Sequence, residues 1–207
     1  MSPPGRILYT NFSTNAGEMS VAFFIAYLNN LITLPAPLAG KLEQACHEEI
    51  YQPHQVIHAA GQPETRLWFL SQGFCRAYYF DHTGKEHTLA FYDAGDLIFS
   101  YEGYWQESTD RYLEALDRSV LISLRYTDLH SMLQDYPQAI KLKDIFVRRH
   151  EHLERFRKRL MTWSAEERYL QTRKLQPDLF RKTSVRLIAT YLNMTRENLS
   201  RLMARDL

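Results

Sequence analysis

The sequence predicts an α+β protein in which a β-rich segment is followed by a helical one. Short apolar runs separated by turn residues lie between Glu48 and Arg125, a long helical stripe follows over 138–161, and two short helical segments occupy 184–204. Short strands that recur at a spacing of roughly ten residues are typical of an antiparallel sandwich or barrel. We therefore expect a sandwich or barrel, then one long helix, then a small helical domain.

Length and composition are those of a globular protein. The 207 residues suffice for one large or two small domains, because domains commonly contain about 100 to 200 residues. Apolar residues make up 45% and charged residues 24% of the chain, which excludes disordered and collagen-like proteins. Two cysteines, Cys46 and Cys75, are too few for a disulfide framework or a four-cysteine metal site, and they favour a reducing, cytoplasmic compartment.

The most apolar stretch, 21–34, is expected to form a packed helix. Tyr27 and two asparagines interrupt it, so it is too short and too polar to span a bilayer. A signal-peptide core is the alternative, but only Arg6 precedes the stretch as a basic residue, and Glu18 lies close to it. We therefore expect no contact with a membrane.

The β-rich segment divides into six strands at its turn signals. The expected strands are 66–70, 75–80, 86–92, 96–99, 112–116 and 120–124. Gly, Pro, Asp and Ser residues separate them, and the second and third strands flank a turn that contains Gly84, which is typical of a hairpin.

The long helix carries an apolar stripe with a heptad spacing. A short helix over 128–134 ends before Pro137, and the next helix covers about 138–161. The stripe consists of Leu142, Phe146, Arg149, Leu153, Phe156, Leu160 and Trp163, which alternate in steps of four and three. This spacing predicts a coiled-coil seam that pairs with the same helix of a second chain. An ordinary amphipathic helix that packs on its own domain is the alternative.

The near-neutral net charge hides two oppositely charged parts. Residues 1–140 carry 8 Lys or Arg and 16 Asp or Glu, a net charge of −8, whereas residues 141–207 carry 17 and 8, a net charge of +9. Such asymmetry indicates an acidic module joined to a basic one, and basic modules often bind nucleic acid. A solvated basic helix that binds nothing is the alternative.

The segment 184–204 has the pattern of a helix-turn-helix. Ser184 is a plausible N-cap for a first helix with one apolar face, and the small Ala189 allows a second helix to cross closely. Asn193 lies where the chain must turn, and Asn tolerates the left-handed conformation that such a turn needs. Thr195 caps the second helix. In this motif the first residues of the second helix point into the major groove of DNA.

The exposed side chains of the second helix suit base recognition. Arg donates two hydrogen bonds to guanine, Glu accepts from cytosine, and Asn pairs with adenine. The expected base-reading residues are Arg196, Glu197 and Arg201, with Asn198 and Ser200 as secondary contributors. The expected phosphate contacts are Thr195, Ser184, Lys182 and Arg186. A solvated helix start is the alternative.

These residues resemble a known family. The segment 188–201, with Arg196, Glu197 and Arg201, resembles the helix-turn-helix of the Crp/Fnr transcription regulators, and 66–73, 84–86 and 93–98 are similar to their β-roll sensor domain. The resemblance implies an N-terminal lead (1–33), a cyclic-nucleotide-binding-like sensor (34–136), a dimerisation helix (137–163) and a DNA-binding domain (164–207) whose β-wing is absent. It also implies a homodimer that reads a near-palindrome, RNA polymerase as a partner, and a small effector.

The sequence departs from the nucleotide-binding members of that family. Those members hold the cyclic phosphate with an Arg, whereas the closest register here places Thr109 at that position, and Arg111 could substitute only if the loop shifts by two residues. We therefore expect no cyclic nucleotide as cofactor. A different effector could occupy a pocket built from Tyr101, Glu102, Thr109, Arg111 and Tyr112. A core-filling aromatic cluster without ligand is the alternative.

The sequence contains no recognisable metal-binding or catalytic motif. His54 and His58, or His150 and His152, lack a Cys or carboxylate at a spacing typical of metal ligands, and no nucleophile–base set is recognisable. We therefore expect neither a metal site nor an enzyme. The main rival to a transcription regulator is a β-roll module that binds a ligand or a protein and uses its basic tail only for dimerisation.

Overall fold

The computed structural model describes residues 21–205, so the first 20 residues of the expected N-terminal lead lie outside the described part. It begins with two helices, α1 (Val21–Leu31) and α2 (Ala36–Ala45). α1 is the packed helix that the sequence predicts, because Phe24 and Leu28 are buried in the core and the Phe24 ring lies 4.9 Å from that of Phe69. Within residues 21–205, no helix is both long enough and apolar enough to cross a bilayer.

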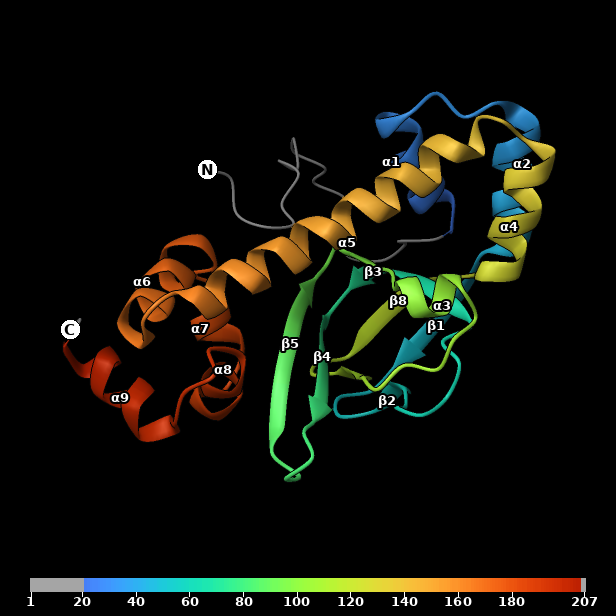
Figure 1. Ribbon diagram of the computed structural model, residues 1–207. Coiled ribbons are helices and arrows are strands. Elements are labelled where there is room, and N and C mark those ends of the chain that lie inside the picture. The colour runs from blue at the N-terminus through green and yellow to red at the C-terminus, as the bar shows by residue number, and fades with distance from the viewer. Residues whose placement is uncertain (1–20, 206–207) are drawn as a thin grey trace.

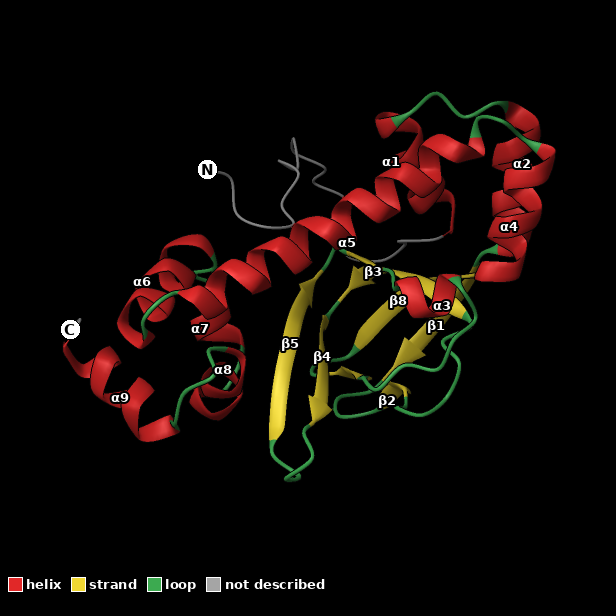
Figure 2. Ribbon diagram, viewed as in Figure 1, coloured by secondary structure: helices red, strands yellow, loops and turns green. Residues whose placement is uncertain are grey.

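The β-rich segment forms two four-stranded antiparallel sheets (Figures 1 and 2). One sheet has the order β1-β8-β3-β6 and the other β2-β7-β4-β5. The strands are β1 (His47–Tyr51), β2 (Val56–His58), β3 (Arg66–Gln72), β4 (Phe74–Phe80), β5 (Glu86–Asp93), β6 (Leu97–Ile98), β7 (Tyr112–Ala115) and β8 (Ser119–Arg125). The predicted sandwich is confirmed, and we call the unit formed by β1 to β8 (residues 47–125) the sensor, after its expected role.

The six expected strands all form, and so does the expected hairpin. β4 and β5 pair from Phe74 opposite Asp93 to Phe80 opposite Glu86, and the turn between them contains Gly84 in the left-handed region at φ 80°. β1 was not expected; it is an edge strand with a polar, largely exposed sequence. Strands are predicted from the alternation of apolar and polar residues. That alternation is weak in β1, because only one edge of the strand pairs and little of the strand is buried.

The remaining elements are helical. They are α3 (Tyr101–Tyr104), α4 (Tyr126–Asp135), α5 (Ala139–Thr162), α6 (Ala165–Leu175), α7 (Leu179–Lys182), α8 (Val185–Tyr191) and α9 (Arg196–Arg205). The long predicted helix and the two C-terminal helices are confirmed within two residues of their expected bounds. α6 was not expected, although Ser164 and Glu167 form the capping box that starts it.

Helix α5 packs on the N-terminal helices, the sandwich and the C-terminal helices, and its apolar stripe faces inward. Figure 1 shows the helix running from α4, along the sandwich, to α6. Leu142 and Phe146 are buried in the core formed with α1, α2 and β3, Leu153 packs on the core between the sheets, and Leu160 is buried with α8 and α9. Arg149 donates to the carbonyl of Gly95 at 3.3 Å.

For its three fully buried residues, the expectation that this stripe is a seam between two chains is therefore corrected. Leu142, Phe146 and Leu160 are fully buried inside one chain and cannot contact a twin. Phe156, only partly buried, packs on the same core as Leu160, and Leu153 contacts the sheets. Periodicity identifies the buried face of a helix but not the surface that covers it, so the alternative of an internally packed amphipathic helix is the one observed.

Candidate nucleic-acid interface and sensor cavity

The two C-terminal helices cross closely around a tight turn. Asn193 adopts the left-handed conformation at φ 49°, as expected, and the amide of Met194 donates to the carbonyl of Ala189 at 3.0 Å. Leu199 and Leu202 of α9 are buried in the same core as Ile188 of α8. The turn and the apolar contacts fix the angle between α8 and α9, so the outer face of α9 is presented rigidly.

That outer face carries the residues expected to read bases. Arg196, Glu197, Ser200 and Arg201 are exposed, and the partly buried Asn198 accepts a hydrogen bond from Arg201 at 2.9 Å. Thr195 acts as the N-cap, because its hydroxyl accepts from the amide of Asn198 at 3.2 Å. These donors and acceptors project from the first turns of α9.

Two of the four residues expected to contact phosphates, Lys182 and Arg186, lie against the sensor. Lys182 pairs with Asp93, and Arg186 pairs with Glu86 at 3.2 Å, so both cations bind carboxylates of β5. Ser184 caps α8, since its hydroxyl accepts from the amide of Leu187 at 3.4 Å. This junction was not predictable from the sequence, because the charges of β5 fit equally well on a solvated strand face.

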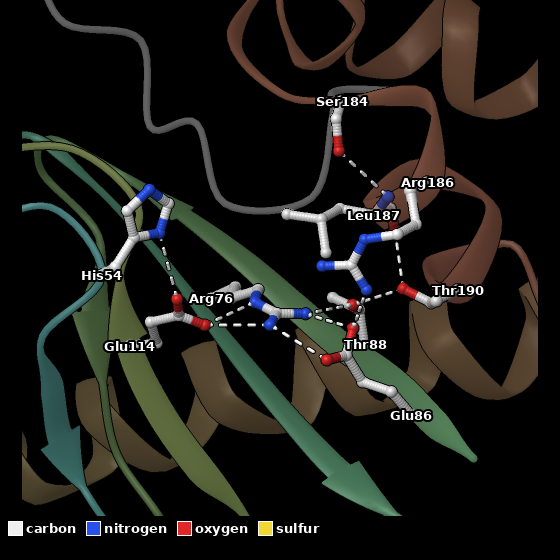
Figure 3. A network of polar contacts seen from close by, with 9 residues as sticks. All are labelled: His54, Arg76, Glu86, Thr88, Glu114, Ser184, Arg186, Leu187 and Thr190. Carbon is white, nitrogen blue, oxygen red and sulfur yellow. Dashed lines mark hydrogen bonds and ion pairs between the residues drawn. The ribbon is translucent and has the colours of Figure 1, made fainter.

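A buried polar network anchors the junction (Figure 3). Arg76, whose side chain is 4% exposed, pairs with Glu86 at 2.8 Å and with Glu114 at 2.9 Å. Burial alone would raise the pKa of Glu86, but Arg76 and Arg186 outweigh it and lower that pKa. The hydroxyls of Thr88 and Thr190 lie 2.7 Å apart. Glu86 is therefore a fixed anion that faces α8.

Two arginines hold the end of α8 from the other side. Arg157 of α5 donates to the carbonyl of Tyr191 and lies 5.3 Å from the centre of its ring. Arg168 of α6 donates to the carbonyl of Asn193 at 3.4 Å. Burial lowers the pKa of Arg157, although the group remains a cation. Cations at the carboxyl end of a helix satisfy its last carbonyls and oppose its dipole.

A cavity of about 640 Å³ lies between the sensor and α5. Its lining contains Leu89, Tyr101, Glu102, Asp110, Arg111, His150, Glu151, Glu154, Arg155 and Lys158. Of the expected effector pocket, Tyr101, Glu102 and Arg111 line this cavity. Thr109 and Tyr112 do not: Thr109 is buried in its loop, and Tyr112 stacks on Tyr78 with ring centres 5.1 Å apart. The contribution of α5 was missed because its polar side chains look like a solvated helix face.

The expected cation of the pocket, Arg111, is already paired with carboxylates. Arg111 pairs with Glu102 at 2.8 Å and with the buried Glu64 at 3.6 Å. Glu64 accepts a hydrogen bond from Ser100 at 2.6 Å, but burial outweighs both partners and raises its pKa. A phosphate brought to Arg111 would have to compete with carboxylates that already bind the guanidinium.

The residues 21–205 contain no group of three or more His, Cys, Asp or Glu side chains that could hold a metal ion. His54 contacts Glu114 at 3.4 Å, whereas His58 is buried. His150 lies in the cavity wall, where burial and then Arg111 lower its pKa.

Comparisons with known proteins agree with this architecture. Residues 48–136 match the model of the cyclic nucleotide-binding domain. FixK2 from Bradyrhizobium japonicum is 22% identical with a TM-score of 0.65, over 77% of this chain and 83% of that chain. A transcriptional regulator of the Crp/Fnr family from Eubacterium rectale is 17% identical with a TM-score of 0.65, over 83% of each chain.

A third solved structure has a similar fold. The c-di-GMP-responsive global regulator CLP from Xanthomonas campestris is 17% identical with a TM-score of 0.62, over 81% of this chain and 90% of that chain. The curated protein sequences give no significant match. Residues 48–136 thus resemble a cyclic nucleotide-binding domain, and over most of its length the chain has the fold of Crp/Fnr regulators.

Proposed function

We propose that the chain is a sequence-specific DNA-binding transcription regulator and that α8 and α9 are its helix-turn-helix. The observation that carries the proposal is the outer face of α9, where Arg196, Glu197 and Arg201 are exposed at the start of a helix that packs firmly across α8. Buried anchors on one face and free polar groups on the other are what major-groove reading requires.

Each side chain has a separate task in this proposal. Arg196 and Arg201 donate to guanine and Glu197 accepts from cytosine, while Asn198 and Ser200 add secondary contacts. Thr195, Ser184, Lys182 and Arg186 contact phosphates and fix the position of the helix on the duplex. The net charge of +9 over residues 141–207 favours the approach to DNA.

A homodimer in the cytoplasm is part of the proposal, since two reading helices about 34 Å apart would match successive turns of a near-palindromic site. Leu142, Phe146 and Leu160 of α5 are buried in their own chain and cannot supply the contact. The outward face of α5 can, and it alternates in charge through Asp144, Arg148, Glu151 and Arg155. RNA polymerase is the further partner that the resemblance suggests.

We also propose that the cavity takes a small effector other than a cyclic nucleotide. The pairing of Arg111 with Glu64 and Glu102 supports the exclusion, because a second anion there would be repelled. An effector would act by binding one arrangement of the two domains more tightly than another.

The proposal is tested by selection from a pool of random duplex DNA. The wild-type chain is expected to enrich one sequence class, whereas R196A/R201A, whose changes lie on the exposed face of α9, is expected to lose that enrichment while remaining folded. Absence of enrichment by the wild-type chain would contradict the proposal and favour a ligand-binding or protein-binding module whose basic tail serves only dimerisation.

A further inference from the structure

We propose that β5 of the sensor acts as a latch, in which two carboxylates occupy the cations that would otherwise bind DNA phosphates. The inference rests on the proposed function, because Lys182 and Arg186 matter here as phosphate contacts. The latch consists of Glu86, Thr88 and Asp93 on β5 together with Lys182, Arg186 and Thr190 on the DNA-binding side.

Both expected phosphate-binding cations are engaged by the sensor at once. Lys182 binds Asp93, and Arg186 binds Glu86 at 3.2 Å. A carboxylate and a phosphate oxygen present the same charge and the same acceptor geometry to an arginine or a lysine. The docked arrangement and the DNA-bound arrangement therefore compete for the same two cations.

The anionic side of the latch is built into the sensor. Arg76 is buried and holds Glu86 in place through a contact of 2.8 Å, and it also pairs with Glu114 at 2.9 Å. Thr88 is fully buried and bonds Thr190 at 2.7 Å, so the docked helix has one fixed register on β5. Figure 3 shows these groups converging between β5 and α8.

The latch leaves the base-reading face untouched. Arg196, Glu197 and Arg201 remain exposed while Lys182 and Arg186 are held. Because phosphate contacts set position and much of the affinity, a chain in the docked state would weaken binding to every DNA sequence alike. The switch would thus change affinity without changing which sequence is preferred.

Removal of the sensor charges tests the latch. E86Q/D93N is expected to bind its selected DNA site about two- to tenfold more tightly than the wild-type chain, because two exposed ion pairs no longer oppose release. D93N alone leaves the Arg76 network intact and is expected to show part of the gain. E43Q/E48Q changes two exposed carboxylates of α2 and β1, removes the same charge and is expected to give no comparable gain.

A reversible cross-link tests the same point without a change of charge. In T88C/T190C the two sulfurs would lie close enough to join, because the native hydroxyl oxygens are 2.7 Å apart. The oxidised form is expected to bind DNA at least about tenfold more weakly than the reduced form, and reductant is expected to restore binding.

The outcomes separate the two proposals. If the wild-type chain selects no DNA sequence, the proposed function fails. If the wild-type and reduced chains bind DNA, but oxidation has no effect and E86Q/D93N binds no more tightly than E43Q/E48Q, the latch alone is overturned. Crosslink-sensitive binding together with tighter binding by E86Q/D93N supports both.

Discussion

The hydroxyl oxygens of Thr88 and Thr190 lie 2.7 Å apart, although 102 positions separate the two residues in the chain. Thr88 belongs to β5 of the sensor, and Thr190 belongs to α8, which supports the exposed helix α9. Arg157 holds the end of the same helix from α5. The sensor and the long helix therefore both contact α8, so a change in either can alter how α9 is presented.

Arg196 is expected to distinguish DNA sequences. R196A should cost about 1–3 kcal/mol of binding free energy on the selected site and far less on random DNA, because a bidentate contact with guanine is lost. R205A removes the same charge from the far end of α9 and should affect both DNAs equally. Fluorescence anisotropy with both duplexes measures the difference. If R196A lost the same binding free energy on both duplexes, Arg196 would be a phosphate contact and not a base contact.

Arg76 is expected to be essential for stability. R76A leaves Glu86 and Glu114 without their buried partner, so the free energy of unfolding should fall by about 3–5 kcal/mol. R118A removes an exposed arginine from the same domain and should change it by less than about 1 kcal/mol. Urea unfolding measures both. An R76A chain as stable as R118A would contradict the described network.

Phe146 is expected to stabilise the single chain and not an interface between chains. F146A should lower the free energy of unfolding by about 3–5 kcal/mol through a cavity, at every protein concentration. I140A truncates an exposed side chain of the same helix and serves as the control. Urea unfolding combined with sedimentation makes the test. If F146A kept its stability but no longer self-associated, the result would support a coiled-coil seam between two chains.

Two histidines, the buried His58 and the partly buried His150, are expected to make the fold sensitive to acid. Burial, and then Arg111, lowers the pKa of His58 and His150 below 6.5, so these groups stay neutral in the fold while the unfolded chain takes up protons. Their contribution to the free energy of unfolding is fully present above about pH 6.5, and it is lost as the pH falls toward the lowered pKa values of the folded state. Glu64, whose pKa is raised from 4.5, acts in the opposite sense, because its contribution is present below about pH 4.5 and is lost as the pH rises through the raised value.

Urea unfolding at several pH values between about 5.5 and 7.5 checks this dependence. H58Q/H150Q should lose less stability over that interval than the wild-type chain does, and H152Q, which changes an exposed histidine of α5, should behave like the wild type. A double variant with the full wild-type loss would show that other groups cause it.

Cyclic AMP is expected to leave the melting temperature unchanged. A ligand stabilises the fold by RT ln(1 + [L]/Kd), so about millimolar nucleotide would reveal even weak binding. E64Q/E102Q removes the two carboxylates that hold Arg111, and any response to nucleotide should appear only in that variant. A clear upward shift for the wild-type chain would overturn the exclusion of cyclic nucleotides.

Elements with strong local patterns were predictable from the sequence. The hairpin of β4 and β5 follows from alternating runs around Gly84, and the turn at Asn193 follows from the tolerance of Asn for left-handed geometry. The exposed face of α9 follows in the same way, because Leu199 and Leu202 mark its buried side. Each of these signals lies within a few residues of the structure it specifies.

Contacts between distant segments were not predictable. The seam of α5 could have faced a second chain or the same chain, and only the position of the sandwich decides between them. The pairs Arg186–Glu86 and Lys182–Asp93 join residues 100 and 89 positions apart, and a charged side chain carries no mark of its partner. The sequence predicted only one wall of the cavity, which contains Tyr101 and Arg111 of the sensor. The other wall comes from α5 and was not predicted.

The most direct test of the account is a salt titration of binding to the selected DNA site and to a scrambled duplex. If α8 and α9 read the major groove, the selected site should bind more tightly than the scrambled one by about a thousandfold or more at physiological salt. The logarithm of affinity should also fall steeply and linearly with the logarithm of salt concentration on both duplexes. Equal affinities on the two duplexes, with little dependence on salt, would contradict the account.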